Sequence, residues 1–318
     1  MRTVLKYRIP RKDKVERKGN FILVNTLDNV HGFVVSSFDK KQQYVFVDGE
    51  VDSTEDQKAA PIFSMDKSQY CDMATKFLIA IRKNNISKAI FSRVKTVHEA
   101  VEPTSLFDNL CAAYPNAFVY LISSPLFGAW VGATPEILLN AENNLASTVA
   151  LAGTMNFDST IPWGEKEKLE QFYVEKFIED KLKSLKLQSL VKSDVHEVIA
   201  GPVKHLCTSF EFKLNNCSVE QVVNELHPTP AVSGLPQEMA LELIWQFEPQ
   251  QRELYAGFIG IIGAETSNLY VNLRCAKIEK KEFHLFVGGG FTADSDIEKE
   301  WLETEIKAET ILNVLQKR

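Results

Sequence analysis

The strongest constraint on the fold lies near the C-terminus, where a strand-like run ends in three consecutive glycines and a helix-forming segment follows. Residues 287–312 read VGGGFTADSDIEKEWLETEIKAETIL, and the triplet is Gly288, Gly289 and Gly290. The polar turn after the triplet offers three candidates for the N-cap of the helix, namely Asp294, Ser295 and Asp296. A strand that passes through a short turn into a helix predicts a fold in which sheet and helix are mixed.

This C-terminal helix carries an acidic face. Glu300, Glu303 and Lys307 are spaced i, i+3 and i+7, so their side chains lie on one side of the helix. A long helix predicted over residues 161–187 repeats the pair with Glu167 and Glu170. Neighbouring carboxylates repel each other unless a cation lies between them, and Mg²⁺ prefers carboxylate oxygens. Two such faces can close on one ion, whereas either helix taken alone could equally present a solvated Glu/Lys face.

The remaining chain alternates between helix-like and strand-like patterns of apolar residues. Three short strands are predicted within residues 21–47, and further helices over residues 64–84, 103–113, 218–226 and 236–247. Strand-like runs separate these helices, and the run over residues 269–279 contains Arg274 among apolar and β-branched residues. A buried arginine requires an anionic partner. The mixture predicts the α+β class, with mostly antiparallel sheets.

Composition excludes several classes of protein. The chain has 318 residues, a net charge of −6 and 45% hydrophobic residues, which suits a globular protein and gives no support for nucleic-acid binding. Residues 2–18 are basic but no apolar run follows them, so we expect a solvated arm or an edge strand, with no signal peptide and no membrane span. Five cysteines without C-x-x-C spacing indicate a reduced, cytoplasmic protein with no structural zinc.

Nine segments, in this order, resemble the chorismate-utilising enzymes, a family that includes isochorismate, salicylate, anthranilate and aminodeoxychorismate synthases. They are SKAIFSR, VGATPEILL, ALAGT, EKEKLEQFYV, VKHLCT, HPTPAVSGLP, RELYAGFIG, LYVNLRCA and the stretch containing EWLET. The resemblance begins near Lys88 and implies large mixed sheets with helices on the outside. It divides the chain into a catalytic region, residues 86–318, and a poorly matched part of the same domain, residues 1–85.

The resemblance also implies a site that binds chorismate through Mg²⁺. Glu170 and Glu303 match direct ligands of the ion, and Glu167 and Glu300 match residues that lie close by or act through water. The substrate-binding positions that match are Gly153, Thr154, His227, Tyr255, Arg274, Gly288, Gly289, Gly290 and Lys307. For His227, packing of a turn histidine on Pro228 is the alternative.

The member of the family depends on what attacks C2 of chorismate. The ALAGT segment lacks the lysine nucleophile of aminodeoxychorismate synthases. Lys88 stands where isochorismate and salicylate synthases keep the base that activates water, although a surface lysine at a strand edge is the alternative. Glu136 matches the general acid that protonates the leaving C4 hydroxyl. Desolvation would favour the neutral lysine and the protonated carboxyl that these roles need.

We therefore expect a Mg²⁺-dependent isochorismate synthase that acts as a monomer on chorismate, without a glutaminase subunit, in menaquinone or siderophore synthesis. A salicylate synthase, which also eliminates pyruvate, shares these residues, and an enzyme like anthranilate synthase component I is the next alternative. A non-catalytic chorismate-binding paralogue would not need both Lys88 and Glu136. A phosphate enzyme built on the glycine triplet is disfavoured, because acidic residues follow the triplet where a G-K-[ST] motif would be needed.

Overall fold

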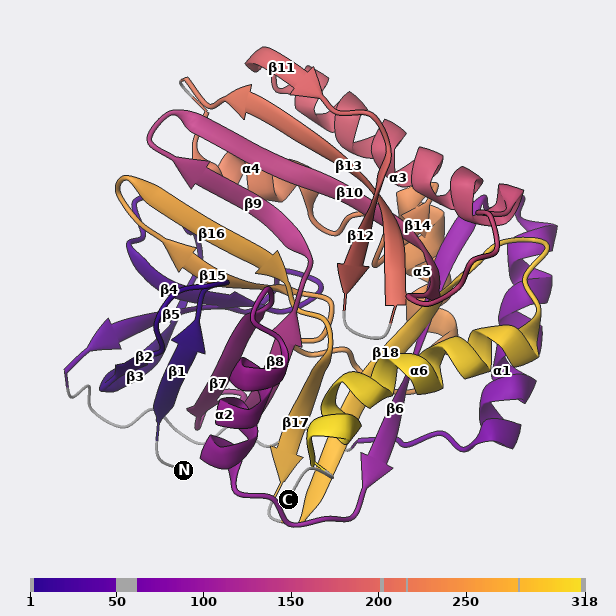
Figure 1. The fold of residues 1–318 in the computed structure, drawn as a ribbon, viewed down its shortest axis with the longest axis horizontal. Helices are drawn as coiled ribbons and strands as arrows, with labels where there is room; N and C mark the ends of the chain where they lie inside the picture. The colour runs from indigo at the N-terminus through magenta and orange to yellow at the C-terminus, as the bar shows by residue number, and fades with distance from the viewer. Residues whose placement is uncertain (1–2, 50–61, 201–202, 216, 280, 316–318) are drawn as a thin grey trace.

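The computed structural model describes residues 3–49, 62–200, 203–215, 217–279 and 281–315, which fold around two large sheets (Figure 1). The first sheet has eight strands. Their order across the sheet is β14 (Gly234–Leu235), β6 (Lys88–Val97), β18 (Glu282–Phe291), β17 (Cys275–Glu279), β8 (Gly128–Thr134), β7 (Phe118–Ser124), β1 (Val4–Arg8) and β2 (Val15–Arg17).

The second sheet has ten strands. Nine follow one path, and β12 (His196–Ala200) pairs with β13 beside it. The path is β11 (Gln188–Lys192), β13 (Val203–Lys213), β10 (Leu145–Asn156), β9 (Ile137–Glu142), β16 (Thr266–Val271), β15 (Phe258–Ile262), β4 (Gly32–Ser36), β5 (Gln43–Asp48) and β3 (Gly19–Val24). Neighbouring strands run antiparallel in both sheets, as the sequence predicted.

Within the described ranges, six helices connect and cover the sheets. They are α1 (Lys67–Lys83), α2 (Pro103–Ala113), α3 (Glu165–Ser184), α4 (Val219–Leu226), α5 (Gln237–Phe247) and α6 (Ile297–Leu315). α3 lies along β10 and α6 crosses β18, so the two helices with acidic faces cover different sheets (Figure 1). Asp296 accepts a hydrogen bond from the Lys299 amide at 2.9 Å, which confirms one predicted cap of α6.

The N-terminal arm is part of the sheet. β1 pairs with β7 on one side and with β2 on the other, and Leu5, Tyr7 and Arg8 are buried. The prediction of a solvated arm is therefore wrong for β1, because its alternate residues face the core, and the prediction of an edge strand holds for β2. The next strands also join the larger structure, since β4 pairs with β15.

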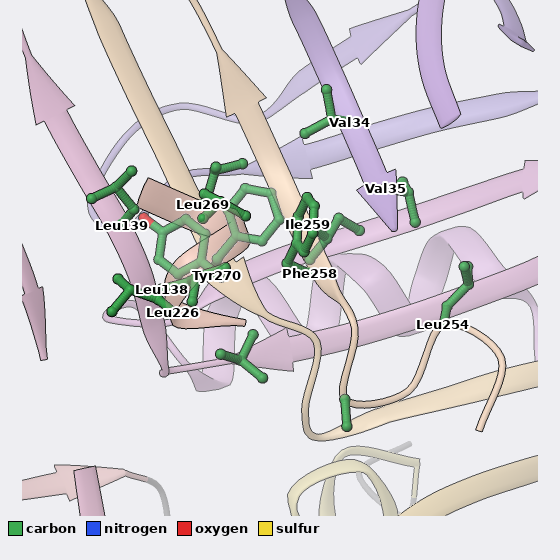
Figure 2. Packing of buried hydrophobic residues seen from close by; sticks show 14 of the residues in the cluster. Val34, Val35, Leu138, Leu139, Leu226, Leu254, Phe258, Ile259, Leu269 and Tyr270 are labelled. Carbon is green, nitrogen blue, oxygen red and sulfur yellow. The ribbon is translucent and has the colours of Figure 1, made fainter. Parts of the chain in front are cut away.

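The largest buried cluster joins elements that are distant in sequence. Figure 2 shows part of it, where side chains from β4, β9, β15, β16 and the end of α4 meet. Phe118 of the first sheet stacks on Tyr270 of the second, with ring centroids 4.6 Å apart. One apolar core therefore holds the two sheets together.

The chain crosses between the sheets several times, and two of these crossings lie side by side. One crossing follows β8 and contains Glu136, and the other follows β16 and contains Arg274. The amide of Val271 donates to the carbonyl of Glu136 at 2.9 Å, and the amide of Ala133 donates to the carbonyl of Arg274 at 3.1 Å. The prediction of one continuous strand over residues 269–279 is therefore wrong, because the chain bends at residues 272–274 to change sheets.

Of the helices in the described part of the chain, none combines the length and the apolar content needed to cross a bilayer.

Candidate active site

A cavity opens where the two crossings meet the ends of β6 and β18. Its lining comes from both sheets and from the acidic helices α3 and α6. Ten of the residues singled out from the sequence line it: Lys88, Glu136, Thr154, Glu170, Tyr255, Arg274, Gly288, Gly289, Gly290 and Lys307. These residues are separated by up to about two hundred positions along the chain, so the fold brings them together.

Lys88 is the first residue of β6 and is 1% exposed, so the surface-lysine alternative is wrong. Its ammonium lies 2.8 Å from a carboxylate oxygen of Glu170 on α3. This ion pair joins the first sheet to the helix that covers the second. Lys88 therefore projects into the cavity with its charge matched by one of the predicted metal ligands.

Glu136 is 8% exposed in the first crossing. Burial raises the pKa of this carboxyl to about 7, although Lys88, Lys307 and Arg274 pull it downward. A carboxyl with such a pKa is about half protonated at neutral pH and can donate a proton. The direction agrees with the role of general acid that the resemblance implies.

Arg274 occupies the second crossing with φ of 50°, in the left-handed region that side chains other than glycine adopt infrequently. Its guanidinium lines the cavity, and its buried NH1 nitrogen has no hydrogen-bond partner among the described residues. Burial lowers the pKa of Arg274, which still remains charged. A desolvated guanidinium nitrogen facing a cavity indicates a site for an anionic group.

The glycine triplet lies inside β18 and pairs with residues 90–92 of β6. A Cβ on Gly290 would lie 2.9 Å from Glu170 Oε1 and 3.0 Å from Lys88 Cε, and one on Gly289 would lie 2.9 Å from Glu300 Oε2. The glycines therefore leave space for the charged side chains to approach the strand. Tyr255 borders the same stretch, because its hydroxyl lies 3.0 Å from a Cβ placed on Gly288.

The acidic face of α6 points at this strand. Glu300 is 1% exposed, so the solvated-face alternative is wrong for this helix. Burial and the neighbouring Glu303 carboxylate raise the pKa of Glu300 to about 7. Burial opposes ionisation of Glu303 as well, but the Lys307 ammonium 2.7 Å away lowers the pKa of Glu303 overall. Lys307 also donates to the Gly288 carbonyl at 2.8 Å, which fixes α6 against β18.

The second acidic helix contributes one carboxylate to the cavity and turns another away. Glu170 lines the cavity, whereas Glu167 Oε2 lies 2.7 Å from a Cβ placed on Gly164, back at the start of α3. Lys166 joins α3 to α6 through an ion pair of 2.7 Å with Glu300. This lysine was not among the site residues predicted from the sequence. Lysine partners therefore pair with all three carboxylates; Glu170 lines the cavity, and Glu300 and Glu303 lie beside Gly289 of β18.

The donor set suits Mg²⁺. Three carboxylates approach the glycine stretch, and Glu300 Oε2 is buried without a hydrogen-bond donor among the described residues. A buried carboxylate oxygen that lacks a donor favours a cation beside it. Glu170, Glu300 and Glu303 are thus the residues that could hold such an ion, whereas Glu167 is directed toward Gly164 at the start of α3.

The ALAGT segment forms a bulge in β10. The register with β13 shifts between Ala152 and Met155, and Gly153 has a φ of 66°. The Gly153 carbonyl faces His205 Nδ1 at 2.8 Å, so Gly153 supports the cavity wall while Thr154 lines it. His205 also lines the cavity, and burial lowers its pKa to about 4. His205 lies in the VKHLCT segment, which resembles the family, but a histidine in a predicted strand gave no signal that it belongs to the site.

His227 does not line the cavity. Its ring is 2% exposed and packs edge-on against Phe38 and Phe258, and its Nε2 donates to the Phe38 carbonyl at 3.2 Å. The assignment of His227 beside the substrate ring is therefore corrected to a packed histidine at the end of α4. Apolar burial explains the difference, because α4 ends between the core and the β4–β5 turn.

Comparisons with known proteins agree with this architecture. The chain is 30% identical over 245 residues to the isochorismate synthase EntC of Escherichia coli K12, covering 72% of this chain and 62% of that protein. It is 26% identical over 265 residues to anthranilate synthase component 1 of Saccharolobus solfataricus, covering 78% of this chain and 62% of that protein. The chain thus spans less than two thirds of the length of these relatives.

A solved structure shares the whole fold. The menaquinone-specific isochorismate synthase MenF of Escherichia coli superposes with a TM-score of 0.83 at 21% identity, covering 99% of this chain and 89% of that one. A sequence model of the family described as chorismate binding enzyme matches residues 12–316. Nearly the whole chain is thus accounted for by one family, and the protein belongs to the chorismate-binding enzymes.

Proposed function

We propose that this protein is a Mg²⁺-dependent isochorismate synthase, which converts chorismate to isochorismate. The observation that carries the proposal is the meeting of buried Lys88 and buried Glu136 in one cavity that also presents an unpartnered guanidinium nitrogen of Arg274. Such a cavity offers a base, an acid and an anion-binding group to one small substrate. The relative EntC is named as an isochorismate synthase, which supports the same activity.

In the proposed reaction, Lys88 acts as the base and takes a proton from water as the water oxygen bonds to C2 of chorismate. The ring double bonds shift, the C4–O bond breaks, and Glu136 gives its proton to the departing hydroxyl, which leaves as water. The overall reaction adds a hydroxyl from water at C2 and releases the C4 hydroxyl as water, without oxidation. Acid and base groups of this kind typically contribute about 10²- to 10⁴-fold each to the rate.

Arg274 and Tyr255 are assigned to the enolpyruvyl carboxylate. The guanidinium offers a planar pair of donors that matches a carboxylate, and the Tyr255 hydroxyl borders the glycine stretch on the same side of the cavity. Lys307 and the backbone of Gly288, Gly289 and Gly290 complete this anion-binding wall. The wall fixes one end of the substrate so that the ring faces Lys88 and Glu136.

Glu170, Glu300 and Glu303 would hold Mg²⁺, with Glu167 as the outer carboxylate. The bound ion would neutralise the ring carboxylate of chorismate and orient the ring. Lys166 pairs with Glu300 across α3 and α6 and so holds the two helices together, and Lys307 pairs with Glu303 within α6. This role explains why two helices covering different sheets each supply acidic residues to one place.

A base that activates water makes an ammonia source unnecessary, so we propose that the enzyme acts without a glutaminase subunit. We also propose that it acts as a cytoplasmic monomer. The test is to incubate the protein with chorismate and Mg²⁺, without any ammonia source, and to separate the products by chromatography. We expect isochorismate as the main product and no activity in excess EDTA. Stoichiometric pyruvate would indicate a salicylate synthase, anthranilate formed only after ammonium is added would indicate the ammonia-using branch, and full activity in EDTA would refute the metal site.

A further inference from the structure

A cluster of charged side chains lies at the far end of the strands that form the candidate active site. Glu279 ends β17, Glu282 begins β18, and His284 follows two residues later. Their possible ligand atoms all lie within 4.8 Å of one another. Gly290 lies six positions after His284 in β18, a distance of roughly 20 Å at the rise of an extended strand. The cluster is therefore distinct from the chorismate cavity.

Strand register places these side chains on one face of the sheet. Glu279 pairs with Glu282 across the β17–β18 hairpin, and His284 pairs with Thr96 of β6. In Figure 1 the end of β6 and the β17–β18 hairpin lie together at the lower edge of the molecule. Just beyond β6, His98 Nδ1 lies 2.9 Å from Glu282 Oε1. Three strands thus contribute to one cluster.

Within the described part of the chain, His284 presents an unpartnered ring nitrogen to the two carboxylates. Its side chain is 5% exposed, and its Nε2 lies 3.8 Å from Glu279 Oε2 and 3.7 Å from Glu282 Oε2. Both distances exceed a hydrogen bond, and Nε2 is buried without a hydrogen-bond partner among the described residues. A buried, unpartnered imidazole nitrogen that faces two carboxylates at this spacing is typical of a group that binds an ion together with them.

The separation fits a metal ion. Two ligands bound at about 2.0–2.2 Å to a tetrahedral zinc ion lie roughly 3.4 Å from each other, close to the spacing of His284 Nε2 from either carboxylate. On its other side, His284 Nδ1 lies 3.0 Å from Thr96 Oγ1, so Nδ1 can carry the proton and leave the Nε2 lone pair free. Such an outer hydrogen bond is typical of histidine ligands.

The surrounding charge is compatible with a dication. Lys277 faces His284 across the hairpin, but its ammonium is paired with Glu253 at 2.6 Å and lies near the Trp130 ring. Glu279 and Glu282 therefore supply two negative charges beside His284 Nε2, which has no hydrogen-bond partner among the described residues. One imidazole and two carboxylates form a ligand set that suits zinc and its transition-metal neighbours better than Mg²⁺.

We propose that His284, Glu279 and Glu282 form a second metal site, which takes Zn²⁺ or a similar transition-metal dication and is oriented by His98 and Thr96. The site ties β6 to the β17–β18 hairpin and has no part in turnover. The spacing of the cysteines had indicated that the chain carries no structural zinc, but that argument applies to thiolate ligands only.

The test uses the full chain, stripped with a chelator and then kept in excess Mg²⁺ to fill the carboxylates of the candidate active site. Titration with Zn²⁺ by calorimetry, and with Co²⁺ by visible absorption, should show one equivalent bound. Zn²⁺ should also raise the melting temperature, because it binds only the folded state. Isochorismate formation should be the same with and without Zn²⁺.

Substitutions of single residues test which side chains bind the Zn²⁺ ion. Glu282→Gln and Glu279→Gln, at partly exposed positions that folding tolerates, should each weaken Zn²⁺ binding by at least about ten-fold and abolish the rise in melting temperature, and His98→Gln should weaken binding roughly ten-fold. Glu265→Gln at an exposed turn and His196→Gln at an exposed histidine are the matched controls and should bind as the parent does.

Two outcomes would overturn the proposal. Absence of a bound equivalent in the parent protein would mean that Glu279, Glu282 and His284 do not form a metal site. An equivalent that persists in Glu282→Gln and disappears in Glu303→Gln would place the ion in the candidate active site. Neither outcome bears on the conversion of chorismate, which the product assay tests separately.

Discussion

At the scale of single residues, burial gives the candidate site its chemistry. Glu136 and Glu300 are carboxyls whose pKa values burial raises to about 7, and Arg274 is a desolvated cation with an unpartnered nitrogen. The sequence indicated these residue types but could not show that Glu167 turns toward Gly164 or that His227 packs between two phenylalanines. Side-chain direction depends on neighbours that the local pattern does not contain.

Replacing Arg274 by lysine should separate substrate binding from turnover. Lysine keeps the positive charge but loses the planar pair of donors, so we expect KM for chorismate to rise by roughly ten- to one-hundred-fold, with a smaller change in kcat. Steady-state kinetics at saturating Mg²⁺ measure both constants. Arg11→Lys, at an exposed position, is the control, and an unchanged KM in Arg274→Lys would mean that the guanidinium is only structural.

The raised pKa of Glu136 sets the direction of the pH dependence. The proposed acid works only when protonated, so turnover should fall as pH rises through about 7 and the carboxyl loses its proton. Glu136→Gln cannot ionise, and its residual turnover should lack this alkaline decline. The measurement is kcat between pH 5.5 and 9 for both proteins, and the same alkaline limb in the variant would assign the titration to another group.

At the scale of elements, the sequence predicted most helices and hairpins well. α2 has the bounds that Pro103 and the apolar spacing indicated, and the two acidic helices formed as expected. The continuous strand expected over residues 269–279 was wrong, because its apolar pattern does not change where the chain leaves one sheet for the other. The bend at Arg274 is a tertiary requirement, since the Ala133 and Val271 amides hold the two crossings together.

The position of the glycine triplet inside β18 leads to a prediction about that strand. Gly290→Ala should leave the sheet intact but push the ends of Glu170 and Lys88 away, because the new Cβ would lie within 3.0 Å of both. Small displacements of catalytic groups cost up to about 10²-fold, so we expect kcat to fall by at least about ten-fold. Circular dichroism and the melting temperature report the fold, and unchanged kcat would show that the site does not need this close approach.

At the scale of the whole molecule, the two sheets, the antiparallel pairing and the covering helices follow from alternation of patterns along the chain. The resemblance to the chorismate-utilising enzymes predicted which distant segments meet, and the cavity contains ten of those residues. Pattern alone could not predict the N-terminal arm, because β1 is defined by its partner β7 and carries a basic, unremarkable sequence. Strands that depend on a distant partner leave a weak local signal.

Buried neutral histidines connect the fold to acid stability. Burial lowers the pKa of His227 to about 3 and that of His205 to about 4, below the ordinary value near 6.5. The unfolded chain therefore takes up protons first, and stability that is present above pH 6.5 is lost as pH falls toward these values. At pH 5, His227 alone should account for about 2 kcal/mol of that loss.

The measurement is the urea concentration at the midpoint of unfolding, determined at pH 7.5 and at pH 5 for the parent and for His227→Gln. The glutamine amide can still donate to the Phe38 carbonyl but cannot titrate, so its loss of stability on acidification should be smaller. His196→Gln, at an exposed position, is the control and should behave as the parent does. Equal losses in the parent and in His227→Gln would show that His227 is not protonated on unfolding in this range.

The central claim is that Lys88 activates water for attack on C2 of chorismate in the cavity between the sheets. The most direct measurement is to run the reaction in ¹⁸O-labelled water with Mg²⁺ and to determine the mass and the label position of the product. We expect one ¹⁸O atom at C2 of isochorismate, and Lys88→Gln should form this product at least about 10²-fold more slowly while still binding chorismate. Product without label, or labelled product formed by Lys88→Gln at the parent rate, would contradict the account.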